Sequence, residues 1–300
     1  MLIAVLLVRV PAVTTLPMDS DEPIYLDASA EIAEAIRDGD WWRVSSPSLN
    51  REHPGLVKFI YGMGQVVQGT NPDLIERLAV ARSLSMAGSL ATIAVVAWFH
   101  PVAGLALATH TLHAKYGVQA YLDGLPVFWM SVAMMMGWRH RHSTDGRWLL
   151  LSGTCWGAAL AGKWLHGIPG LALLVVLPDW RSRLRMGLTV ILSWWVLDPS
   201  MGTDPIARLT SMMASHHDYA EQLSVATTWV DPLVYLASGL PSIWHPDVFP
   251  VSVDSVWFGL GIVGLILSAR KAYGGFLLAW FALPLVVLML WETRWPQHAM

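Results

Sequence analysis

The stretch Asp21-Glu22-Pro23-Ile24-Tyr25 decides the fold, because it places two adjacent carboxylates directly after an apolar segment. A second polar cluster, Glu52-His53-Pro54-Gly55-Leu56-Val57-Lys58, stands at the start of another helical pattern. Polar clusters that adjoin apolar segments in this way are typical of the surface of a membrane. The two stretches therefore predict polar chemistry that is held beside lipid.

The composition of the chain is typical of an integral membrane protein. Of its 300 residues, 54% are hydrophobic and 14% are charged, whereas soluble domains carry about 25% charged residues. The seventeen tryptophans fit two interfacial belts, where the indole N–H meets lipid headgroups. The single cysteine, Cys155, excludes an internal disulfide and a thiolate metal cluster. No basic patch interleaved with aromatic residues is present, so no nucleic-acid partner is predicted.

The apolar runs predict an all-α integral membrane protein, a polytopic helical bundle with about nine spans. The predicted spans are residues 1–17, 74–99, 102–116, 120–137, 148–162, 165–178, 186–199, 252–269 and 274–291. We expect a single membrane module over residues 1–300, with a long outer loop at residues 200–250. We also expect the protein to continue beyond residue 300.

The first outer loop, residues 18–73, carries two helical patterns that are too short to span a bilayer. Residues 27–38 gather their apolar side chains on one face before Gly39, which is typical of a helix lying on the membrane surface. An ordinary solvated surface helix is the alternative. Residues 54–68 open with a proline suited to the first helical position and carry an apolar stripe. The stripe consists of Leu56, Phe59, Ile60, Met63 and Val67.

The distribution of basic residues predicts the orientation of the chain. With the N-terminus in the cytoplasm, the loops 138–147, 179–185 and 270–273 lie inside. These loops hold eight basic residues, Arg139, Arg141, Arg147, Arg181, Arg183, Arg185, Arg270 and Lys271, against Asp145 and Asp179. The excess satisfies the positive-inside rule at each loop. Nearly all carboxylates then share the outer face of the membrane.

The acidic pair Asp21–Glu22 carries the sharpest chemical prediction. A carboxylate near its operating pKa can take a proton from a hydroxyl group, and a leaving phosphate needs cationic partners or a metal. The pair could therefore serve as a general base or as a metal ligand. The alternative is a charged, solvated loop without chemistry. No other set of residues shows convincing metal-ligand spacing.

Three further charged residues stand at the predicted outer surface. Lys58 could extend to lipid phosphates or pair with the phosphate of a lipid carrier. Asp123 lies at the edge of hydrocarbon, where a carboxylate is costly without a partner, so it is a functional candidate or else a helix cap. Lys163 lies between two apolar runs and could pair with Asp123 in a structural role.

The order of these motifs resembles the C-type superfamily of membrane glycosyltransferases, within it the protein O-mannosyltransferase and lipid A aminoarabinose transferase group. The acidic pair followed by Tyr25 is similar to the first outer loop of that group. The stretch His53-Pro54-Gly55-Leu56-Val57-Lys58 resembles its His-Pro-Pro-Leu-Gly-Lys segment, with Gly55 in place of the second proline. Further similar segments are Gly39-Asp40-Trp41, Ala81-Arg82-Ser83, Leu122-Asp123-Gly124-Leu125, Gly162-Lys163-Trp164, Asp198-Pro199 and Trp295-Pro296-Gln297-His298.

The resemblance implies a C-type architecture and an inverting hexosyl- or pentosyltransferase that takes its sugar from a polyprenyl-phosphate carrier. It implies catalytic roles for Asp21 and Glu22. The residues that would hold the donor phosphate are Lys58, Arg82, Arg294 and His298. The residues that would line the cavity are Tyr25, His53, Asp123 and Lys163.

The resemblance also implies a location in the plasma membrane of a prokaryote, with the active site on the outer side. The acceptor could be a protein, a lipid or a polysaccharide. Participation of a divalent cation stays open.

Two other classes of protein are weighed against this one. A transporter or flippase for a lipid-linked or anionic solute would carry charges within its spans, and Lys163 is the clear example. Transporters commonly show two similar halves, and residues 1–150 and 151–300 share no repeat. A structural membrane subunit would tolerate the substitution Asp21→Asn, which the enzyme hypothesis forbids.

Overall fold

The computed structural model describes residues 2–70, 72–143, 145–202, 204–222, 228, 230–271 and 273–290, and these residues form helices and loops without a strand. In chain order the helices are α1 (Leu2–Thr15), α2 (Glu22–Arg37), α3 (Trp41–Ser45), α4 (Leu56–Gln68), α5 (Leu74–Phe99), α6 (Pro101–Thr109), α7 (Thr111–Tyr116), α8 (Gly124–Ser143), α9 (Gly146–Gly162), the 3-10 helix η1 (Trp164–Gly170), α10 (Leu171–Val176), α11 (Trp180–Leu197), the 3-10 helix η2 (Pro199–Met201), α12 (Pro205–Gln222), α13 (Asp231–Ser238), α14 (Leu240–Trp244), α15 (Asp254–Ser268) and α16 (Gly274–Leu290).

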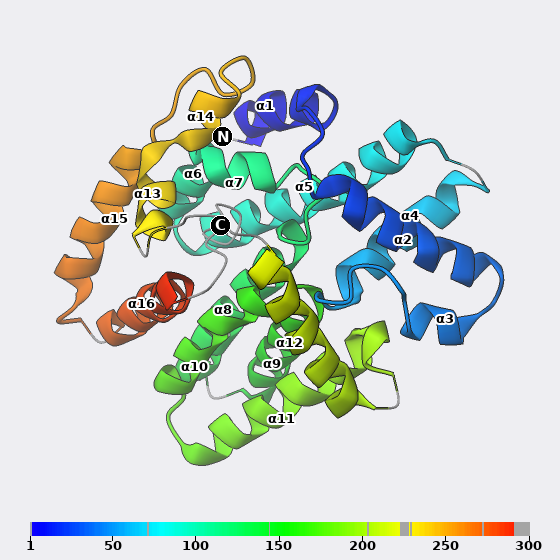
Figure 1. Ribbon diagram of the computed structural model, residues 1–300. Helices are drawn as coiled ribbons and strands as arrows, with labels where there is room; N and C mark the ends of the chain where they lie inside the picture. Colours follow the sequence, from blue (N-terminus) through cyan, green and yellow to red (C-terminus); the bar gives the residue numbers. More distant parts are fainter. Residues whose placement is uncertain are drawn as a thin grey trace.

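The helices form four groups around the centre of the molecule (Figure 1). Helices α2, α3 and α4 lie on one side, and α13, α15 and α16 lie on the opposite side. Helices α8 to α11 pack together between and below them, while α1, α6 and α7 lie above. The two polar stretches quoted at the outset border α2 and α4, so the fold brings them to the same side.

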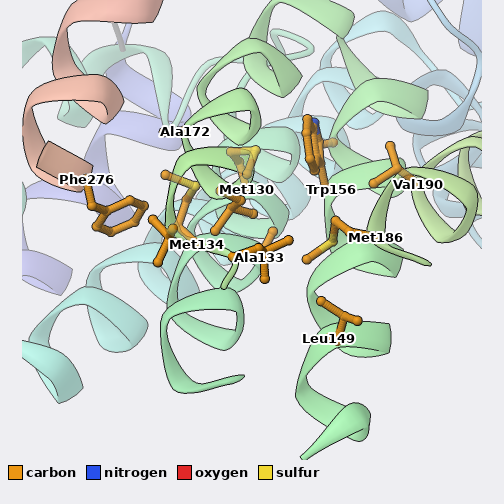
Figure 2. Close-up of a cluster of buried hydrophobic side chains, with 13 residues drawn as sticks. Met130, Ala133, Met134, Leu149, Trp156, Ala172, Met186, Val190 and Phe276 are labelled. Carbon is orange, nitrogen blue, oxygen red and sulfur yellow. The ribbon is translucent and has the colours of Figure 1, made fainter. Parts of the chain in front are cut away.

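The largest buried apolar cluster joins α8, α9, α10, α11 and α16 (Figure 2). In it, Met134 from α8 and Trp156 from α9 are buried with Met186 from α11. Gly157 allows the close approach of α11, because a Cβ atom there would lie 2.6 Å from the Cβ of Ser193. This tight packing gives a rigid base on which the polar residues of the opposite end are held.

Helix α4 presents its polar face to the protein and its apolar face outward. Lys58, Tyr61 and Gln65 are buried, whereas Met63 is 41% and Val67 is 85% exposed. The second half of the predicted apolar stripe therefore faces outward, whereas the first half is partly buried. This inverted arrangement is what a helix at a lipid surface needs, because lipid replaces the core as its apolar partner.

The two helices of the first outer loop begin at other residues than predicted. Helix α2 begins at Glu22 rather than at residue 27, with Asp21 at its N-cap position. Helix α4 begins at Leu56 with Gly55 at its N-cap position, so Pro54 precedes the helix. Both acidic residues of the 21–25 stretch therefore belong to a helix start, where the positive end of the helix dipole favours negative charge.

The described helices match the predicted spans only in part. Among the described helices, α5 alone has the length and apolar composition to cross a membrane, and three further segments are apolar but shorter, 164–176, α15 and α16. The predicted span 102–116 is divided at His110, where the backbone is extended. The predicted span 165–178 is likewise divided into η1 and α10.

The break between helices α6 and α7 at His110 has a specific cause. The buried carboxylate of Asp254 accepts the backbone N–H of Thr111 at 2.9 Å and its hydroxyl at 2.5 Å, which starts α7 as a new helix. A hydropathy pattern cannot predict this, because the partner lies on α15, far away in the sequence. The predicted loop 200–250 also differs, since it contains α12, α13 and α14.

Candidate functional site

Glu22 is the buried anchor of the site. Its side chain is fully buried, and its two oxygens accept from the guanidinium of Arg82 at 2.9 and 2.6 Å. The same carboxylate accepts the backbone N–H groups of Asp19 at 2.9 Å and Ala120 at 2.6 Å. Glu22 thereby fixes the start of α2 against α5 and against the loop before α8.

Arg82 completes this anchor from α5. Its remaining N–H groups donate to the carbonyl oxygens of Val13, Leu16 and Pro17 at 2.9, 2.8 and 3.0 Å. Carbonyl groups at the end of a helix lack partners within the helix, and Arg82 supplies them for α1. All three guanidinium nitrogens of Arg82 are thus occupied within the protein. A role of Arg82 in holding a donor phosphate stays a prediction.

Asp21, next to this anchor, is in a different environment. Its carboxylate is half-buried, makes no capping bond to α2, and accepts a long hydrogen bond of 3.4 Å from the hydroxyl of Ser20. Burial raises the pKa of Asp21, the charge of Lys163 opposes this shift, and the carboxylates of Asp19 and Asp123 add to it. A carboxylate without a tight partner and with a raised pKa is suited to accept a proton.

Asp123, Lys163 and His166 form a buried triad beside Asp21. The predicted pairing of Lys163 with Asp123 is confirmed, with the ammonium 2.9 and 3.0 Å from the two carboxylate oxygens. His166 adds a contact of 2.5 Å between its Nε2 and Oδ1 of Asp123. His166 was not predicted, although its position three residues after Lys163 places both on one helical turn.

A row of aromatic rings runs from His53 toward the acidic residues. The ring of His53 lies 5.9 Å from that of Tyr25, Tyr25 lies 5.8 Å from Tyr121, and Tyr121 lies 5.2 Å from Tyr116, all edge to face. The hydroxyl of Tyr61 holds the backbone of this row by donating to the carbonyl of Tyr121 at 2.7 Å. The row brings two of the residues predicted to line the cavity, Tyr25 and His53, into contact with each other.

At the His53 end of the row, two cations converge on one oxygen atom. Lys58 donates to the carbonyl of His53 at 3.0 Å and to that of Asn50 at 2.7 Å. Arg208 from α12 donates to the same His53 carbonyl at 3.1 Å. Burial and the charge of Arg208 together lower the pKa of Lys58 to about 8, with the charge of Asp198 opposing them. The sequence did not predict Arg208, which is 155 residues from His53.

Arg208 also lines a cleft of about 260 Å³ between α3, η2 and α12. A second guanidinium, that of Arg51, and the indole of Trp42 line the same cleft. The further lining residues are Ser45, Ser46, Pro47, Ser200, Met201, Gly202, Asp204 and Ser211. Two guanidinium groups and several hydroxyls against one carboxylate make this cleft suitable for an anion.

The remaining predictions for the site are not covered by the described residues. Arg294 and His298, with the segment Trp295-Pro296-Gln297-His298, lie outside them. Within the residues that the structure describes, no group of three or more His, Cys, Asp or Glu side chains could hold a metal ion. Participation of a divalent cation accordingly stays open.

Comparison with known proteins identifies solved structures with a similar fold. No protein-family model matches the chain, and no curated protein matches its sequence. The helical fold is similar to that of a solved membrane-enzyme structure, which agrees with the resemblance seen in the sequence motifs at the level of the fold. One solved protein with a similar fold is ArnT from Cupriavidus metallidurans, a lipid A aminoarabinose transferase.

The apo crystal structure of ArnT aligns with a TM-score of 0.64 over 99% of this chain at 18% identity. A second crystal structure, of ArnT bound to undecaprenyl phosphate, aligns with a TM-score of 0.54 over 96% of this chain, also at 18% identity. The chain spans 56% and 58% of the lengths of those two chains.

Proposed function

We propose that the protein is an integral membrane glycosyltransferase that moves a sugar from a polyprenyl-phosphate carrier to an acceptor hydroxyl. The observation that carries the proposal is one arrangement of residues. A half-buried carboxylate, Asp21, lies one helical turn before Tyr25, and the ring of Tyr25 contacts His53, whose carbonyl oxygen accepts from both Lys58 and Arg208. The crystal structure of ArnT bound to undecaprenyl phosphate supports the class of carrier.

The proposed chemistry assigns one end of the row to the acceptor and the other to the donor. Asp21 takes the proton of the acceptor hydroxyl while that oxygen attacks the anomeric carbon of the sugar. The bond from the anomeric carbon to the carrier phosphate breaks, and its electron pair leaves with the phosphate. Lys58 and Arg208 stabilise the charge of the departing phosphate. Attack from the face opposite the phosphate inverts the anomeric centre.

The triad keeps a cation beside the proposed base. Lys163 is held by both oxygens of Asp123, and His166 contacts Oδ1 of that carboxylate. A buried ammonium fixed in this way favours the charged form of Asp21 and limits how far burial raises its pKa. Glu22, in contrast, is fully occupied by Arg82 and backbone N–H groups, so we assign it a supporting role.

Exposed apolar side chains support the proposed location in a membrane. On α15 and α16 the outward-facing residues include Val256, Leu260, Val263, Ile266, Leu267, Leu278, Val286 and Leu290. A continuous apolar surface of this kind is unfavourable in water and favourable in lipid. The positive-inside pattern of the loops then puts Asp21 and Lys58 on the outer face.

The proposal is tested by reconstituting the protein in proteoliposomes and supplying polyprenyl-phosphate donors labelled in the sugar, together with a mixed acceptor extract. We expect transfer of label to an acceptor, or slow hydrolysis of the donor. No turnover with any donor, combined with movement of labelled carrier or solute across the bilayer, would instead establish the transporter hypothesis.

The pKa of Lys58 leads to a pH-dependent affinity for the carrier phosphate. A phosphate monoester is a dianion above about pH 7, so between pH 7 and 9 the change in charge comes from the lysine. Because the ammonium form of Lys58 is lost as the pH rises through about 8, affinity should fall about fivefold between pH 8 and 9. Binding of undecaprenyl phosphate to the protein in nanodiscs measures this.

The variant Lys58→Met is the control for this pH dependence. It should bind undecaprenyl phosphate more weakly at pH 7 and show little change in affinity up to pH 9. If the variant loses affinity with pH as steeply as the wild type, another group titrates and the assignment of Lys58 to the phosphate is wrong.

A further inference from the structure

Asp198 is a buried carboxylate that follows the end of α11. Only 1% of the residue is exposed, and its Oδ1 accepts the backbone N–H groups of Gly55 at 2.8 Å and Ser200 at 3.0 Å. The hydroxyl of Ser200 donates to the same oxygen at 2.7 Å. These bonds join η2 to the His53-Pro54-Gly55 stretch, which is 143 residues earlier in the chain.

A closed ring of hydrogen bonds extends from this carboxylate to the two cations. The hydroxyl of Ser200, which donates to Asp198, accepts from Nε of Arg208 at 3.2 Å. Arg208 in turn donates to the His53 carbonyl, which also accepts from Lys58. Asp198 therefore fixes the His53-Pro54-Gly55 backbone, which Lys58 and Arg208 both contact. Through the hydroxyl of Ser200 it also fixes the guanidinium of Arg208.

Capping of α11 does not explain this carboxylate. A negative charge at the C-terminus of an 18-residue helix lies at the negative end of the helix dipole, where it is unfavourable. Burial raises the pKa of Asp198, and the nearby charge of Lys58 opposes this shift. The side chain of Asp198 instead caps the start of η2 and, by accepting from Gly55, ties this cap to the peptide that both cations contact.

The residue at position 55 fits the same interpretation. A Cβ atom on Gly55 would lie 2.7 Å from Oδ1 of Asp198 and 3.2 Å from Ser200. A proline at this position, as in the segment of the family that this stretch resembles, would also lack the N–H group that donates to Asp198. Glycine at this position is what allows the carboxylate to approach.

We infer that Asp198 is a positioning residue that sets the spacing of Lys58 and Arg208 for a phosphate group of the donor. This inference rests on the proposed function. Asp198 reaches the phosphate only through Gly55, His53 and Ser200. Its effect is therefore on the affinity for the phosphate, and the proton transfer at Asp21 is independent of it.

The test measures the binding of undecaprenyl phosphate to the protein in nanodiscs, together with KM and kcat for a labelled donor. Asp198→Ala and Ser200→Ala break the ring at two points, and each should weaken binding, the former by about tenfold. KM should rise in parallel while kcat changes by less than about threefold. Asp198→Asn keeps an oxygen for the three donors and should restore most of the affinity.

The matched control is Asp179→Ala. Asp179 caps the other end of α11 and accepts from the N–H and hydroxyl of Ser182 at 2.8 and 3.0 Å. It carries the same kind of local bonds and lies far from the cations, so its loss should leave binding unchanged. A general effect of losing a carboxylate that caps α11 would appear in both variants.

Three outcomes would overturn the inference. They are unchanged affinity in folded Ser200→Ala and Asp198→Ala, an Asp198→Asn protein as weak as Asp198→Ala, and a loss confined to kcat. Binding that responds as expected in a protein that transfers no sugar would support the positioning role and refute the proposed transferase. Sugar transfer by the wild type, with a KM that is unchanged in the Asp198 and Ser200 variants, would support the transferase and refute the positioning role.

Discussion

Replacing Asp21 by asparagine is expected to lower kcat for sugar transfer by about 10²- to 10⁴-fold, the usual contribution of a general base. The asparagine has nearly the same shape, and the carboxylate that it replaces makes one long hydrogen bond, to Ser20. Affinity for undecaprenyl phosphate and the midpoint of thermal unfolding should therefore change little. Turnover of a labelled donor in proteoliposomes measures the effect.

The pH dependence of the wild type provides a second readout for Asp21. Burial raises the pKa of Asp21, and a base is active only in its deprotonated form. The acid limb of kcat/KM should thus lie at higher pH than an ordinary aspartate would give.

The control for this experiment is Asp27→Asn on the same helix. Asp27 is exposed and pairs with Arg77 at 3.3 Å, and ion pairs at the surface contribute little to stability. Its loss should leave turnover unchanged. If Asp21→Asn keeps more than a third of the wild-type kcat, Asp21 is not the base.

Breaking the pair of Glu22 and Arg82 should have the largest effect on stability. The substitution Glu22→Gln removes the negative charge and leaves the guanidinium of Arg82 buried without a counter-charge. Loss of one partner of a buried ion pair typically costs about 3–5 kcal/mol. Unfolding by denaturant in detergent micelles, followed by tryptophan fluorescence, should show a loss of this size.

The double variant Glu22→Gln, Arg82→Met separates the pair from its surroundings. Once both charges are removed, no uncompensated charge remains, so the double variant should be less destabilised than the sum of the two single variants. Additive effects would mean that the two groups stabilise the fold independently. The carbonyl groups at the end of α1 would still lose their donors, so we do not expect full recovery.

Much of the candidate site could be predicted where the chemistry is local in sequence. The acidic pair, Lys58 and the pairing of Asp123 with Lys163 follow from polar residues that interrupt apolar runs, where an unpaired charge is costly. Helix α5 was predicted as residues 74–99 and is present at those bounds. In each of these cases a few adjacent residues contain the whole signal.

The features that were missed depend on contacts between distant segments. Arg208 lies in what reads as a polar loop, and its meeting with His53 follows only from the packing of α12 against the first outer loop. The division of the 102–116 segment depends on Asp254 in the same way. The spacing of apolar residues in α4 predicts an apolar face. It does not tell whether that face contacts lipid or the protein core, because the same residue types suit both surroundings.

The contact of Arg82 with the carbonyl groups of α1 imposes an order on biosynthesis. The donor to the carbonyl oxygen of Leu16 is Arg82, which is 66 residues later in the chain. During translation, the first helix therefore leaves the ribosome long before its end can be satisfied by protein. Docking of this helix is a late event that follows the arrival of α5.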